Sequence, residues 1–116
     1  MEITLENPYF FTATILDWKL LFKQEKFKTI ITNSLNYLVE SKRMKVYSFV
    51  IMDNHIHLIW QSLNNTTYKE NQLSFMKFTA QQIIKELRNN HPEVLKHFEV
   101  NLKDRKYQIW KRNPLS

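Results

Sequence analysis

Two apolar runs that are separated by only two residues constrain the fold of this chain more than any other feature. Residues 46–52 (VYSFVIM) and 55–61 (HIHLIWQ) are rich in β-branched and aromatic side chains, which favours strands. Asp53 and Asn54 lie between them, and a two-residue connection is typical of a β-hairpin. Both residue types tolerate a positive φ, so such a turn does not need glycine. We therefore predict an antiparallel hairpin here.

The segments around this hairpin alternate between strand and helix patterns. Helices are indicated where apolar residues recur at a spacing of three and four, and strands where aromatic and β-branched residues gather. Pro92 suits the first turn of a helix. The further predicted elements are a strand over residues 9–17, a helix over 24–41, a polar loop over 62–71, a helix over 72–89, a short helix from 93 to about 100, and a last strand over 106–110.

This order of elements, β-α-β-β-α-(α)-β, is close to the ferredoxin-like split βαβ unit. It predicts an α+β fold in which a central antiparallel sheet carries its helices packed on one face. A length of 116 residues suits one domain, so we expect a single domain over residues 1–116.

Composition narrows the classes of function. The net charge of +6 favours an anionic partner, with nucleic acid first and a membrane surface second. Glycine and cysteine are both absent, which excludes glycine-rich phosphate loops, disulfides and thiolate zinc sites. No signal peptide and no apolar run long enough to span a bilayer are present. We expect a cytoplasmic protein without a membrane partner.

The sequence Asn54-His55-Ile56-His57 is the candidate for metal chemistry. Side chains at positions i and i+2 of a strand share one face, so His55 and His57 would point together while Ile56 points into the core. Two imidazoles placed in this way can hold one cation, although at least one more protein ligand, plus water or phosphate, is needed. Two polar residues on a solvated face are the alternative interpretation. His91 and His97 have no partner at ligand spacing and are predicted to be surface residues.

At this point the sequence resembles a known family. Residues 47–60 (YSFVIMDNHIHLIW) are similar to the signature hairpin of HUH single-tyrosine transposases, which include insertion-sequence transposases and REP-associated tyrosine transposases. The usual form of that hairpin is Met-Pro-Asn-His-hydrophobe-His, and this chain has Asp53 in place of the proline. Residues 11–14 and 77–79 also resemble the family, so the similarity covers nearly the whole chain.

The resemblance implies that His55 and His57 hold a divalent cation, Mg²⁺ or Mn²⁺, which polarises the scissile phosphate of single-stranded DNA. In the family a tyrosine attacks that phosphate and forms a 5′-phosphotyrosine, from which the strand is rejoined. The tyrosine lies on a further helix, which is expected beyond Ser116, so whether this chain is itself an enzyme stays open. Tyr68 and Tyr107 are much less favoured as substitutes.

Residues 103–112 combine five cations with aromatic rings and one acid, Asp104. Cations for phosphates and rings for unstacked bases are typical of single-strand binding. The alternative is a solvated strand edge that lysines keep soluble. The basic residues in 42–45 would extend the same surface, and Trp60 is expected in the core. The candidate DNA-binding residues are Lys103, Arg105, Lys106, Tyr107, Trp110, Lys111 and Arg112.

Three functions therefore compete. The first is cleavage and rejoining of single-stranded or hairpin DNA in transposition. The second is a non-cleaving DNA-hairpin-binding module that derives from such a transposase. The third is an RNA-binding ferredoxin-like domain, which the lack of stacking rings beside the two histidines disfavours. For each of the three functions, the chain could act as a homodimer or as a monomer.

Overall fold

The computed structural model describes residues 7–112, and its centre is a three-stranded antiparallel sheet. β3 (His55–Ser62) is the middle strand, with β1 (Tyr9–Thr14) on one side and β2 (Met44–Ile51) on the other. The predicted hairpin is confirmed as β2 and β3. Residues 1–6 and 113–116, which the single-domain prediction also covers, lie outside the described residues.

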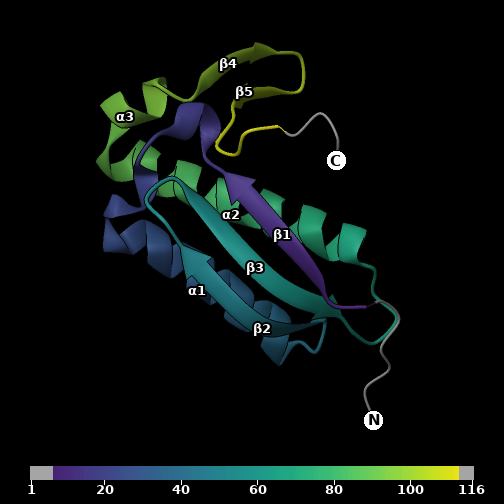
Figure 1. The fold of residues 1–116 in the computed structure, drawn as a ribbon. Coiled ribbons are helices and arrows are strands. Elements are labelled where there is room, and N and C mark those ends of the chain that lie inside the picture. The colour runs from purple at the N-terminus through teal and green to yellow at the C-terminus, as the bar shows by residue number, and fades with distance from the viewer. Residues whose placement is uncertain (1–6, 113–116) are drawn as a thin grey trace.

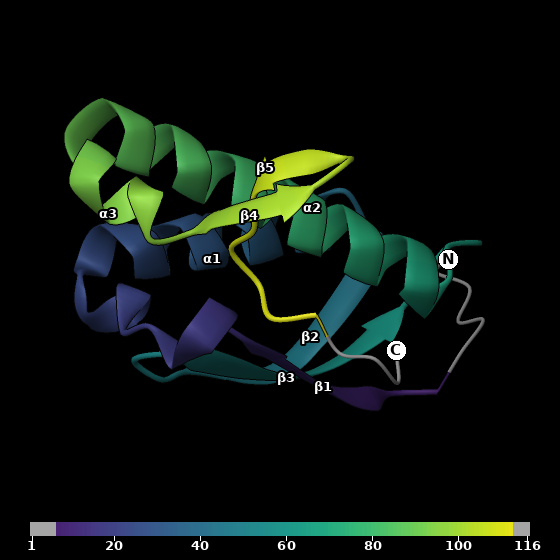
Figure 2. The ribbon, with the colours of Figure 1, turned by 90° about the horizontal axis from the view of Figure 1, so that it is seen from above.

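Two long helices cover one face of this sheet, as Figure 2 shows. These are α1 (Glu25–Glu40) and α2 (Tyr68–Asn90), and both pack onto the side chains that β3 turns toward them. Ile56, Leu58 and Trp60 are each at most 1% exposed, which places them in the core as the alternation of β3 predicts. The predicted α+β class, with helices packed on one face, is confirmed. None of the described helices is apolar over enough of its length to cross a bilayer.

Several element boundaries differ from the sequence prediction. The short helix predicted from 93 to about 100 ends at Lys96, because Glu99 already belongs to a strand. Two further boundaries differ for local reasons. β1 ends at Thr14 because the chain turns there into two short 3₁₀ turns, Leu16–Trp18 and Leu21–Lys23. α2 begins at Tyr68, four residues before the predicted start, because the Thr67 hydroxyl accepts a hydrogen bond from the Glu70 backbone N–H at 3.2 Å. This side-chain cap satisfies a donor that the first turn of a helix leaves free.

The predicted last strand, residues 106–110, is wrong as a strand of the central sheet. After α3 (Pro92–Lys96), the chain forms a separate two-stranded sheet of β4 (Glu99–Leu102) and β5 (Arg105–Tyr107). The chain then crosses to the end of β1 (Figure 1), where an isolated bridge pairs Ile15 with Trp110. We call residues 108–112 the C-terminal arm. It is held there by main-chain bonds from Leu16 N to Ile109 O and from Lys111 N to Thr14 O, both 2.7 Å.

Candidate functional site

His55 and His57 lie together on the face of the sheet that the two helices leave open. Both side chains are half-buried, and their ring centroids are 4.8 Å apart at an interplanar angle of 81°. Thr12 and Val50 flank His57 on the neighbouring strands, since each is its register partner. The Phe10 ring lies 5.4 Å from the His57 ring. The strand thus brings two imidazoles to one point beside apolar neighbours.

Both imidazoles are oriented through Nδ1. The His55 Nδ1 lies 2.7 Å from the Asn54 Oδ1, and an amide oxygen can only accept, so this Nδ1 carries the proton. The Asn54 amide nitrogen donates to the Trp18 carbonyl oxygen at 3.4 Å, which assigns the amide orientation. The His57 Nδ1 lies 2.9 Å from the Thr12 hydroxyl. Hydrogen bonds at one ring nitrogen that leave the other as the ligand are typical of metal-binding histidines.

The turn that presents these rings is fastened to the segment that follows β1. The Asn54 and Asp53 carbonyl oxygens accept backbone hydrogen bonds from Ile15 and Phe22, both at 2.9 Å. Neither turn residue has a positive φ, so the tolerance of Asn and Asp for that conformation is not used here. A backbone bond across the turn, from the Met52 N–H to the His55 carbonyl oxygen at 2.8 Å, and the two long-range bonds hold the turn instead.

The described residues supply two nitrogen ligands and no complete metal cage. Within residues 7–112, no group of three or more His, Cys, Asp or Glu side chains could hold an ion. The two imidazoles would fill two positions around a cation, and a further protein ligand with water or phosphate oxygens would have to fill the others. The chemistry of the donor set therefore fits part of a coordination sphere.

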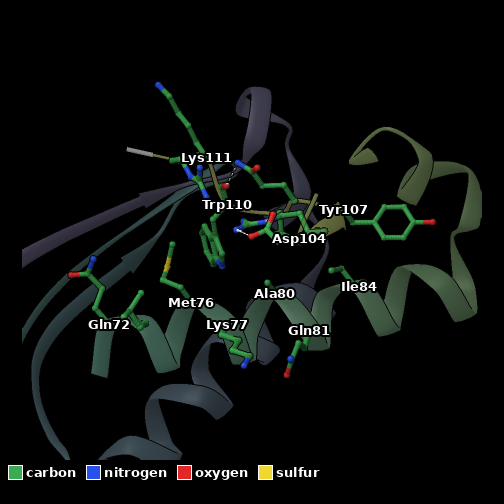
Figure 3. Close-up of a pocket in the computed structure, with 15 residues that line it drawn as sticks. Gln72, Met76, Lys77, Ala80, Gln81, Ile84, Asp104, Tyr107, Trp110 and Lys111 are labelled. Atoms are coloured by element: carbon green, nitrogen blue, oxygen red, sulfur yellow. Dashed lines mark hydrogen bonds and ion pairs between the residues drawn. The ribbon is translucent and has the colours of Figure 1, made fainter. Parts of the chain in front are cut away.

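A basic groove of about 950 Å³ lies between α2 and residues 104–112 (Figure 3). Apolar carbon from α2, such as Met76 and Ile84, forms part of its wall, and three glutamine amides add hydrogen-bonding groups. Four of its lining residues are cations, which are Lys77, Arg105, Lys111 and Arg112.

Asp104 is the acidic member of this lining, and it is paired within the groove. Its carboxylate lies 3.0 Å from the Arg105 guanidinium. The hydrogen bond from Arg105 lowers the pKa of Asp104 below its ordinary value of 3.8, so the carboxylate stays ionised at neutral pH. Even with that pair, the lining keeps a surplus of positive charge.

The structure separates the candidate DNA-binding residues into three groups. Arg105, Tyr107, Lys111 and Arg112 line the groove. Lys103 and Lys106 form the second group, which does not line the groove. Lys103 is exposed between β4 and β5, and the Lys106 ammonium lies 5.5 Å from the centroid of the Tyr107 ring.

Trp110 forms the third group, because it lines the groove while its ring belongs to the core. It is 6% exposed, and its indole N–H donates to the Thr79 hydroxyl at 3.0 Å. At 6% exposure the indole offers little surface for stacking on a base, and the predicted contact of Trp110 with DNA stays a prediction. Trp60, expected in the core, is fully buried.

The other candidates from the sequence lie elsewhere. Arg43 donates from Nε to the Asn71 side-chain oxygen at 3.0 Å, near the end of the sheet where Met44 pairs with Ser62. The histidines occupy the opposite end of β3, and none of the basic residues in 42–45 lines the groove. His91 does not stand alone, since its Nε2 lies 2.7 Å from the Lys26 ammonium, whereas His97 is exposed as predicted.

Two tyrosines were weighed as substitute nucleophiles. Tyr68 packs against Tyr9 with ring centroids 4.9 Å apart, at the end of β1 that lies away from the histidines. The Tyr107 ring is flanked by the Arg88 guanidinium at 5.9 Å and by the Lys106 ammonium. Neither contact involves the histidine pair.

The α2 wall of the groove was missed by the sequence reasoning, apart from Lys77, which carried part of the family resemblance. Gln72, Met76 and Ala80 recur four residues apart along α2 and look from the sequence like ordinary surface and core positions. These α2 residues line a groove only because residues 104–112 lie across the helix.

The chain matches no protein-family model and no curated protein. Among solved structures, it is similar to a REP-associated tyrosine transposase bound to a REP hairpin. The TM-score is 0.60 at 12% sequence identity, and the match covers 95% of this chain and 55% of the other. The likeness is one of fold, and this chain spans little more than half of the length of that protein.

Proposed function

We propose that this chain is a DNA-binding domain of the HUH tyrosine-transposase type, which holds hairpin or single-stranded DNA beside a divalent cation for cleavage and rejoining. The observation that carries the proposal is the convergence of His55 and His57 on the open face of the sheet, 4.8 Å apart. The similarity in fold to a transposase bound to a DNA hairpin supports the choice of partner.

The basic groove supplies the electrostatic part of DNA binding. Its four cations can each neutralise a phosphate, and binding of this kind releases counterions from the DNA. With about four contacts to a single strand, affinity should fall roughly 50-fold between about 50 and 200 mM salt. The glutamine amides and apolar carbon of the same groove suit contacts with bases and sugars.

The histidine pair supplies the metal part. When bound, the cation would polarise a phosphate oxygen as a Lewis acid. Oxygen ligands suit both Mg²⁺ and Mn²⁺, but of the two Mn²⁺ is the transition-metal ion and accepts an imidazole nitrogen more readily. We therefore favour Mn²⁺ over Mg²⁺ for the two ligands that the described residues offer. Asn54 and Thr12 hold the rings in place through Nδ1.

A metal titration tests this proposal. Mn²⁺ should broaden the NMR signals of His55 and His57, and His57→Ala should weaken Mn²⁺ binding at least about 10-fold, which is the lower end of what even an outer-shell change costs. His97→Ala is the matched control, because that histidine is exposed and distant in sequence. Equal Mn²⁺ binding by both variants would contradict the metal site.

A non-cleaving hairpin-binding module is the second candidate, and the lack of a third His, Cys, Asp or Glu near the pair in residues 7–112 favours it. Intact-mass measurement after incubation with single-stranded DNA and Mn²⁺ tests whether a residue of this chain attacks the DNA. We expect an unchanged protein mass, because the contacts of Tyr68 and Tyr107 lie away from the histidine pair. A covalent DNA adduct would instead assign the nucleophile to this chain.

A further inference from the structure

Trp18 is exposed in an unusual way for a tryptophan. Its side chain is 58% exposed, while Trp60 and Trp110 are buried. Trp18 and the preceding Asp17 both have a positive φ, 54° and 55°, although neither is glycine. That conformation costs free energy for such residues, and it is typically kept at sites where the backbone must aim a side chain.

One side chain links this strained turn to the histidine pair. The Asn54 amide nitrogen donates to the Trp18 carbonyl oxygen, while the Asn54 amide oxygen accepts from the His55 ring at 2.7 Å. The turn closes on itself through a bond from the Trp18 N–H to the Ile15 carbonyl oxygen at 2.9 Å. Trp18 is therefore held at the end of the sheet where the imidazoles lie.

A cation from the groove meets the same ring. The Lys111 ammonium lies 4.2 Å from the centroid of the Trp18 indole, within the range of a cation–π contact. Lys111 also lines the basic groove, and its backbone N–H is bonded to Thr14 at the end of β1. The indole thus stands where the groove and the histidine end of the sheet meet.

We propose that Trp18 is a stacking platform for one unpaired base of a DNA strand that runs from the basic groove to His55 and His57, with Lys111 contacting the adjacent phosphate. Bases stack on exposed indole rings regardless of sequence, and a neighbouring cation secures the backbone. The inference rests on the proposed function, because it assumes that DNA is the ligand of the groove. It assigns to Trp18 the role that the sequence alone suggested for Trp110.

Binding measurements with two DNA hairpins test the platform. One hairpin is blunt, and the other has the same stem with a single-stranded extension of six nucleotides. Trp18→Ala should weaken binding of the extended hairpin about 5- to 150-fold, which is the loss of one stacked base at about 1–3 kcal/mol. Binding of the blunt hairpin should change less than about 2-fold. Trp18→Phe should recover part of the loss, since phenylalanine also offers a ring.

Leu20→Ala is the matched control, because Leu20 is a large apolar side chain of the same segment and is 51% exposed. It should leave both affinities unchanged. Fluorescence gives an independent readout, since Trp18 is the exposed tryptophan of the three. Extended DNA should quench the emission of the wild-type chain, and Trp18→Phe should remove that quenching. Thermal unfolding of each variant checks that the fold is kept.

The outcomes separate this inference from the proposed function. If the wild-type chain binds neither hairpin, the proposed DNA function fails and the platform fails with it. If the wild type binds the extended hairpin and Trp18→Ala binds it equally well, DNA binding stands and the platform is refuted. Quenching that persists in Trp18→Phe would likewise refute it, because the base would then stack on another ring.

Discussion

The bond between Trp110 and Thr79 fixes the C-terminal arm to α2, and its removal gives the sharpest test of the structure. Both side chains are buried, at 6% and 0% exposure, and the indole N–H donates to the Thr79 hydroxyl at 3.0 Å. The hydroxyl itself donates to the Phe75 carbonyl oxygen at 2.7 Å. Thr79→Val keeps the volume of the side chain but leaves a buried indole N–H without an acceptor.

The magnitude follows from that unpaired donor. A buried N–H that loses its partner costs about 1–3 kcal/mol of the free energy of unfolding. Trp110→Phe removes the donor and leaves a smaller ring, at a cost below the roughly 3–5 kcal/mol of a tryptophan truncated to alanine. In the double variant no donor remains to be satisfied. The sum of the losses of unfolding free energy in Thr79→Val and Trp110→Phe should therefore exceed the loss in the double variant by about 1–2 kcal/mol.

Urea unfolding followed by circular dichroism at 222 nm measures all three variants, since tryptophan emission would itself change. Thr29→Val is the matched control. Its hydroxyl also donates to a carbonyl oxygen one helical turn back, that of Glu25 at 3.0 Å, but the residue is exposed on α1. Thr29→Val therefore reports how much a valine by itself changes the free energy of unfolding when it replaces a threonine in a helix. Losses for Thr79→Val and Trp110→Phe that add to within about 0.5 kcal/mol would refute the reasoning.

Three further predictions concern charge and buried polarity. Lys77→Ala combined with Arg112→Ala should flatten the plot of log affinity for single-stranded DNA against log salt by about 1.4, and an unchanged slope would count against the groove. Ser34 is buried and its Oγ has no hydrogen-bond partner among the described residues, so Ser34→Ala should raise the urea-derived free energy of unfolding by about 0.5–1 kcal/mol; a loss of stability would show that the hydroxyl is satisfied. The hydrogen bond from Asn90 lowers the pKa of Glu86 below 4.5, so its contribution to stability is present above the unfolded-state pKa and is lost as pH falls through the lower folded-state pKa. Glu86→Gln should accordingly flatten the fall in melting temperature below about pH 4.5, and an equally steep fall in the variant would contradict this.

The hairpin and the histidine pair could be predicted because their signals are local. Alternation along β3 puts Ile56 and Trp60 into the core and the two histidines on the other face, and the structure places all four accordingly. The start of α2 also had a local signal that was overlooked. Thr67 followed three residues later by Glu70 is the sequence pattern of a capping box.

The C-terminal arm could not be predicted because its position depends on contacts between distant residues. Residues 106–110 have the composition of a strand, yet only Trp110 forms a bridge to the end of β1, and Tyr107 belongs to a separate sheet. The burial of Trp110 depends on Thr79 of α2, which no local pattern indicates. The exposure of Trp18 has the same origin, since two consecutive left-handed residues carry no signal in a chain without glycine.

The turn between β2 and β3 has a consequence for how the molecule folds. A short hairpin ordinarily closes early, because its two strands are neighbours in the chain. Here the turn has one bond of its own, from the Met52 N–H to the His55 carbonyl oxygen at 2.8 Å. The carbonyl oxygens of Asn54 and Asp53 are bonded only when the amides of Ile15 and Phe22, about 30 to 40 residues earlier in the chain, reach them. The imidazoles therefore acquire their final setting late, after the entropy of closing a long loop has been lost. Unfolding of residues 15–22 would therefore release the tip of the hairpin and the setting of the two imidazoles, while the pairing of β2 with β3 persists.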